Sequence, residues 1–166
     1  MPKMSTPGEW VLLSYRLPRE PSTPRIGVWR KLKRLGVAQL GDGLVALPAD
    51  ARTREQLDWI AEEVTESGGT AGVWIARPAT LAQERQLAQD MAEARATEYR
   101  ALQATAVAQA QATGLGTPER ARALRRLRGE LRKIERRDYF PPAERDAARD
   151  AVNALQPTDE ITEDTA

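Results

Sequence analysis

The feature that most constrains the fold is the alternation of short apolar runs with amphipathic segments in the first half of the chain. Four runs of four to eight residues, bounded by glycine or proline, have the length and composition of β-strands. Two longer segments repeat their apolar residues every three or four positions, which is typical of helices that bury one face. The strand candidates are residues 10–17, 37–40, 44–47 and 70–76, and the helix candidates are residues 24–35 and 50–67.

The order of these segments is β-α-β-β-α-β. Gly41-Asp42-Gly43 lies between the two middle strands and is a signal for a tight hairpin, whereas a helix separates the members of each outer pair. This order is that of the split βαβ arrangement. We therefore predict an α+β fold with a ferredoxin-like domain over residues 10–78.

The chain after Pro78 is predicted to be helical throughout. It is rich in alanine, glutamine, glutamate and arginine, and residues 118–137 carry a leucine stripe at helical spacing. We expect an all-helical C-terminal extension over residues 79–156, in which residues 103–112 form an exposed or frayed helical end. Residues 1–9 are predicted to be a disordered lead and the acidic residues 157–166 a disordered tail.

The 166-residue chain contains neither cysteine nor histidine. This composition excludes disulfides, thiolate or imidazole metal sites, and catalysis by cysteine or histidine nucleophiles and bases. Several ferredoxin-like nucleases place a metal-binding aspartate at the end of the first strand, where this chain has Arg16, a cation that repels Mg²⁺. We expect a protein that is not an enzyme and that needs neither metal nor cofactor.

The N-terminus lacks the apolar stretch of a signal peptide, and the longest apolar runs have only four to six residues. A membrane-spanning helix needs about 20 such residues. We therefore expect a cytoplasmic protein without a membrane partner.

Charge is separated along the second half of the chain. Residues 118–137 hold nine basic and three acidic side chains, whereas residues 138–166 hold two basic and eight acidic ones. One interpretation is a basic helix that contacts nucleic-acid phosphates, with the acidic tail competing for the same surface. The other is a solvated helix whose arginines pair with Glu119, Glu130 and Glu135.

The first predicted helix leaves the same choice open. Residues 16–34 hold seven basic side chains and one acidic one, which is compatible with a phosphate, oxyanion or partner surface, or with ordinary amphipathicity. The residues predicted to contact DNA or phosphate on the two basic helices are Arg30, Lys33, Arg34, Arg122, Arg125, Arg126, Arg128, Arg132 and Lys133.

Three further arginines are candidates for binding an oxyanion. Arg16, Arg19 and Arg25 cluster around the end of the first strand and the start of the first helix. A helix N-terminus with neighbouring arginines suits a tetrahedral dianion.

The four tryptophans divide into two groups. Trp10, Trp29 and Trp74 have apolar neighbours and are expected in the core. Trp59 projects from the side of its helix opposite the apolar face, so we expect it to be exposed, as a contact for a partner or as a residue covered by the helical extension.

Three motifs resemble the start of the chromate-resistance regulator family ChrB. They are W-x-L-L-S-Y-x-L-P at Trp10–Pro18, R-x-x-x-W-R-x-L-x-x-L-G at Arg25–Gly36, and D-G-x-x-x-L-P at Asp42–Pro48. More distantly, the first 78 residues resemble the ferredoxin-like middle domain of PaaX-type repressors. The ChrB resemblance implies a regulator of chromate-efflux genes, with DNA binding in the N-terminal half of the family's proteins and anion response in the rest.

Together these observations favour a chromate-resistance transcription regulator that binds DNA through its basic helices. One alternative is a module that does not bind DNA and that dimerises, or holds a separate sensor protein, through the sheet edge, Trp59 or the alanine-rich helix. Another is a protein that binds chromate or a similar oxyanion directly. The expected partners are accordingly DNA, an oxyanion effector, a second copy of the chain and a separate sensor protein.

Overall fold

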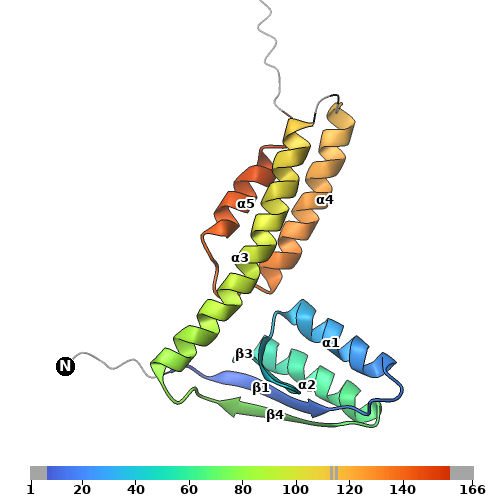
Figure 1. The fold of residues 1–166 in the computed structure, drawn as a ribbon, viewed down its shortest axis with the longest axis vertical. Coiled ribbons are helices and arrows are strands. Elements are labelled where there is room, and N and C mark those ends of the chain that lie inside the picture. The colour runs from blue at the N-terminus through green and yellow to red at the C-terminus, as the bar shows by residue number, and fades with distance from the viewer. Residues whose placement is uncertain (1–6, 113, 115, 158–166) are drawn as a thin grey trace, which may run out of the picture. The chain divides into compact units, whose positions relative to one another are not determined.

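The computed structural model describes residues 7–112, 114 and 116–157. They form the predicted mixture of one sheet and several helices (Figure 1), which confirms the fold class. The elements are β1 (Trp10–Arg16), α1 (Thr23–Leu35), β2 (Ala38–Gly41), β3 (Leu44–Pro48), α2 (Ala51–Glu66), β4 (Thr70–Ala76), α3 (Leu81–Gln111), α4 (Thr117–Arg136) and α5 (Glu144–Asn153).

The four strands form one sheet in the order β2-β3-β1-β4, and every neighbouring pair is antiparallel. This is the ferredoxin-like topology, in which each crossover helix joins two strands that run in the same direction with a third strand between them. Helices α1 and α2 cover one face of the sheet (Figure 1). Val11 and Leu13 of β1 are fully buried against that face, together with Val28 and Leu32 of α1.

The strand β4 lies at an edge of the sheet, and none of its seven residues is buried. Trp74 is 59% exposed, so its predicted place in the core is wrong. It pairs with Leu12 on the face away from α1 and α2, and its Nε1 donates a hydrogen bond to Ser14 Oγ at 3.0 Å. An apolar run indicates a strand, but it does not tell an edge strand from a central one.

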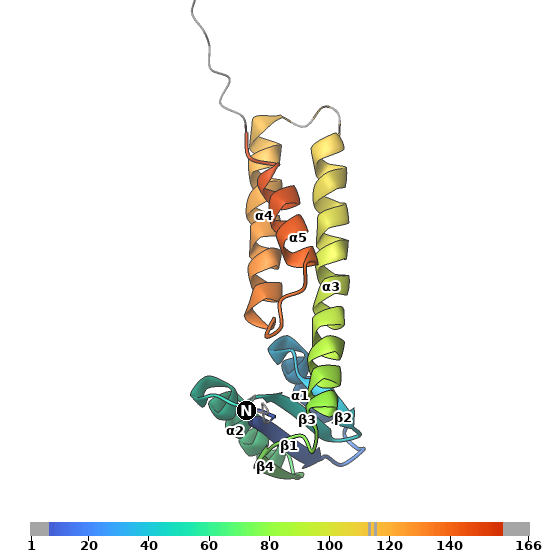
Figure 2. The same cartoon turned by 90° about the vertical axis from the view of Figure 1, so that its left-hand side faces the viewer.

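A second core joins α3, α4 and α5, which Figure 2 shows side by side. Tyr99, Leu102 and Ala106 of α3 are buried in it. The helix continues to Gln111, so residues 103–111 are not frayed, but most of this stretch is exposed, as one of the two predicted alternatives stated, and only Ala106 within it is buried. Small side chains there allow neighbouring helices to approach closely, which is why a stretch without large apolar residues still contributes to a core.

The described residues form two compact units. The first runs to Ala92 and also includes Arg137–Phe140, so the division between the two units lies within α3. Phe140 stacks on Trp10 with ring centroids 6.0 Å apart, and Tyr139 Oη donates a hydrogen bond to the Leu35 carbonyl at 3.2 Å. A short segment near the end of the chain therefore completes the core of the sheet unit.

The predicted disordered segments are described only in part. Residues 7–9 are held in place, since Gly8 N donates to Glu84 Oε1 at 2.8 Å and Arg77 contacts Glu9 at 3.0 Å. Residues 1–6 and 158–166 lie outside the described residues. Within the described part of the chain, no helix is both long and apolar enough to span a bilayer.

Candidate functional site

Helix α4 separates an apolar face from a basic face. Successive residues are about 100° apart around an α-helix, so residues three, four and seven apart share one side. The buried side consists of Ala123, Leu124, Leu127, Leu131 and Ile134. The opposite side, which we call the α4 stripe, consists of Arg122, Arg125, Arg126, Arg132, Lys133 and Arg136, with Gly129 at its centre.

Most of the α4 stripe is not neutralised by neighbouring carboxylates. Arg122, Arg125, Arg126 and Arg132 are exposed, and none of the four has a hydrogen bond or ion pair with another described residue. Of the predicted acidic partners, Glu130 pairs with Lys133 of the stripe at 3.0 Å, and Glu135 pairs with Arg149 of α5 at 2.6 Å. This arrangement disfavours the interpretation that the arginines of α4 are held by the acids of their own helix.

Arg128 differs from the other predicted contact residues on α4. It is half-buried at the margin of the apolar face, and its Nη2 donates a hydrogen bond to Asn153 Oδ1 at 3.3 Å. Arg136 lies on the α4 stripe but was not among the predicted contact residues. Counting positions around the helix would have placed it there.

The three predicted contact residues on α1 are exposed, but they lie in the other unit. Lys33 Nζ lies 5.4 Å from the centroid of the Trp29 ring, a cation–π contact. The neighbouring Lys31 pairs with Glu63 of α2. Arg30 and Arg34 thus remain the more accessible cations of this shorter basic surface.

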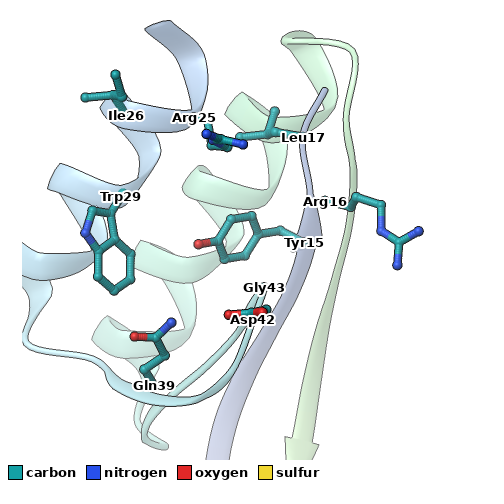
Figure 3. A pocket seen from close by; sticks show the side chains of 9 residues that line it. All are labelled: Tyr15, Arg16, Leu17, Arg25, Ile26, Trp29, Gln39, Asp42 and Gly43. Carbon is teal, nitrogen blue, oxygen red and sulfur yellow. The ribbon is translucent and has the colours of Figure 1, made fainter. Parts of the chain in front are cut away.

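A cleft of about 590 Å³ lies where the end of β1, the start of α1 and the β2–β3 turn meet. Figure 3 shows Tyr15 and Trp29 facing it from β1 and α1, with Gln39 and Asp42 below them. Burial raises the pKa of the Tyr15 hydroxyl above its usual value, so this group stays protonated at neutral pH and can donate a hydrogen bond. Sequence reasoning missed the cleft because its walls come from three separate segments.

The structure brings together only part of the predicted oxyanion site. Arg16 and Arg25 both line the cleft, although the side chain of Arg16 extends away from Tyr15 and Trp29 (Figure 3), and Arg19 is not among the lining residues. Asp42 lines the same cleft and would repel a dianion. Direct oxyanion binding therefore stays a prediction.

Trp59 is 62% exposed on α2, as predicted. It borders a groove between α1 and α2 whose lining also includes Leu35 and Ile60. Its proposed role as a partner contact stays a prediction. In the described part of the chain, no group of three or more acidic side chains is placed to hold a metal ion.

Comparison with known proteins identifies relatives of the chain. The family described as "Protein ChrB, N-terminal" matches residues 25–165. A curated relative, protein ChrB of Cupriavidus metallidurans, is 37% identical over 93 residues, which are 56% of this chain and 25% of the relative. The chain thus covers about a quarter of that protein's length. No solved structure matches.

Proposed function

Because the chain belongs to the ChrB N-terminal family, we propose that it is a transcription regulator of chromate resistance that binds duplex DNA through the α4 stripe. The observation that carries the proposal is the row of four exposed arginines without partners among the described residues. The proposed role is that of a cytoplasmic binding protein rather than an enzyme.

The geometry of α4 suits a phosphate backbone. Ten residues separate Arg122 from Arg132, which corresponds to about 15 Å along a helix. Duplex DNA carries one negative charge per about 1.7 Å of its axis, so a basic row of this length meets several phosphates. Guanidinium groups suit such contacts because each can donate two parallel hydrogen bonds to one phosphate.

Phosphate contacts position a protein on DNA without reading its sequence. The α4 stripe therefore accounts for affinity, and the choice of operator depends on contacts to base edges or on DNA shape. The proposal concerns the electrostatic part, which a salt titration measures directly.

We expect the affinity for a duplex from upstream of the protein's own gene to fall with salt, such that log K is linear in log salt with a slope of about −3.6 to −5.4 for about four to six phosphate contacts. Replacing Arg122, Arg125 and Arg126 together by glutamine should reduce the magnitude of that slope by about 2 to 3. Fluorescence anisotropy of a labelled duplex, beside a scrambled one, measures both quantities. Glutamine is chosen because it favours helices almost as well as arginine.

The matched control is Arg30→Gln with Arg34→Gln, which removes exposed cations from α1 without touching α4. If this pair lowers the slope and the triple α4 variant leaves it unchanged, DNA contact belongs to α1 and the assignment to α4 is wrong. If the wild-type protein binds neither duplex at low salt, the DNA-binding proposal itself fails. Circular dichroism of each variant establishes that the helices are intact.

A further inference from the structure

Strand β4 has the composition of a buried strand but the position of an exposed one. Its sequence, TAGVWIA, contains no charged residue and no proline. None of its residues is buried, and Trp74 and Ile75 are 59% and 47% exposed on opposite faces of the strand. No described strand pairs with its outer edge.

The two edges of the sheet are built differently. At one edge, β2 has four residues, and its pairing with β3 is interrupted by a register shift between Gln39 and Gly41. Short length and irregularity of this kind protect an edge from pairing with another chain. At the other edge, β4 pairs with β1 over seven consecutive residues without interruption. A long, regular and uncharged edge is a template for a further strand.

We propose that β4 pairs antiparallel with β4 of a second copy of this chain, about a two-fold axis that passes through Val73. Val73 is the midpoint of Thr70–Ala76, so this register alone pairs all seven residues of both strands. An isologous contact of this type joins two sheets into one continuous sheet of eight strands.

The register matches large side chains with small ones. Trp74 of one copy lies opposite Gly72 of the other, and Ile75 lies opposite Ala71. Directly opposite residues of an antiparallel pair have their Cβ atoms only about 4.5–5.5 Å apart, so such pairs pack without collision. The small residues Ala71 and Gly72 precede Val73 and the large residues Trp74 and Ile75 follow it, so the strand is self-complementary when it is reversed on itself.

The orientation of Trp74 leaves the strand edge open. The indole is tied to Ser14 of β1 and lies over Gly72, where a Cβ would be only 3.1 Å from Nε1. The ring therefore leans toward its own sheet rather than across the edge. On pairing, the two indoles would lie on the same face on either side of the axis, where aromatic rings shield the backbone at glycines.

Cysteine variants test the register of the two β4 strands. Because the natural chain contains no cysteine, any disulfide must form between the introduced thiols. Val73→Cys places the two thiols opposite each other across the axis, within the Cα separation of about 4.4–6.8 Å that a disulfide requires. We expect a disulfide-linked dimer on mild oxidation. Ala71→Cys is the control, because its two thiols are offset by four residues, or about 13 Å. Adding Ile75→Cys to Ala71→Cys should restore the cross-link.

Light scattering measures the mass of the protein in solution and therefore tests dimer formation without any DNA being present. We expect a dimer for the wild-type chain and a folded monomer for Ile75→Lys, which adds a charge at an exposed edge position. Trp59→Lys, at an even more exposed residue of α2, should stay dimeric. A wild-type monomer at all concentrations, a dimer that survives Ile75→Lys, or equal cross-linking of Val73→Cys and Ala71→Cys would overturn the proposal.

Discussion

At the scale of single residues, Gly43 decides how the hairpin meets the first strand. Its φ is +70°, and a Cβ on this residue would lie 2.3 Å from the Tyr15 carbonyl oxygen. The Gly43 carbonyl accepts a hydrogen bond from Tyr15 N at 2.8 Å. One glycine therefore provides both the left-handed turn and the close approach that forms the floor of the cleft.

We expect Gly43→Ala to lower the free energy of unfolding by at least about 2 kcal/mol, because it combines left-handed strain with a backbone collision. Urea denaturation followed by tryptophan fluorescence measures the loss. Gly41→Ala is the matched control, since no atom lies within 4 Å of the added methyl group and its φ is not positive. Similar losses for the two variants would contradict this explanation.

Sequence reasoning found the turn at Asp42-Gly43 because turn signals are local. It did not find the contact with Tyr15, which joins residues 28 positions apart. It grouped Arg16 with Arg25, and both residues line the cleft. The other walls of the cleft could not be predicted, because they depend on how three separate segments pack.

At the scale of elements, α4 carries a glycine at the centre of its basic face. Gly129 lies in the helix interior, and nothing comes within 4 Å of the position of a Cβ. Glycine in this setting destabilises a helix by about 0.5–1 kcal/mol relative to alanine, because it gains more backbone freedom on unfolding. No side chain therefore projects from the centre of the α4 stripe.

Gly129→Ala should therefore raise the free energy of unfolding by about 0.5–1 kcal/mol. Thermal denaturation followed by circular dichroism provides the measurement. Gly27→Ala, in α1, is a second helical glycine with open space around it and should behave similarly. A destabilised Gly129→Ala variant would show that the methyl group meets an obstacle.

The types and approximate limits of the elements followed from the sequence, because apolar periodicity and the glycines and prolines that end helices and strands are local properties. The edge position of β4 agrees with the predicted ferredoxin-like order, but the exposure of Trp74 was missed, because an apolar side chain usually indicates burial. The same limit applies to α3, whose apolar residues serve two different cores and so form no single stripe.

At the scale of the whole molecule, the sheet unit is discontinuous in sequence. Arg137–Phe140 belong to it although α3 and α4 intervene. The Trp10–Phe140 stack is the main aromatic contact of this return segment. No local signal in the sequence indicates that a Tyr-Phe pair before two prolines packs on the first strand, and this is why the return segment was not predicted.

Phe140→Ala should destabilise the sheet unit by about 1–3 kcal/mol, less than for a fully buried phenylalanine because the ring is half-buried. Urea denaturation followed by the fluorescence of Trp10 and its neighbours measures the change. Tyr139→Phe removes only the hydroxyl that bonds the Leu35 carbonyl and should cost about 1 kcal/mol. If Phe140→Ala leaves the transition unchanged, the return segment does not support the sheet.

The return segment also sets an order of events during synthesis on the ribosome. The strands and helices up to α2 emerge first, but the aromatic ring that covers Trp10 emerges only after α3 and α4 have been made. Until then the nascent chain carries an uncovered indole, an exposed apolar surface of the kind that favours aggregation. The core of the N-terminal unit is therefore completed only after α3 and α4 have been synthesised.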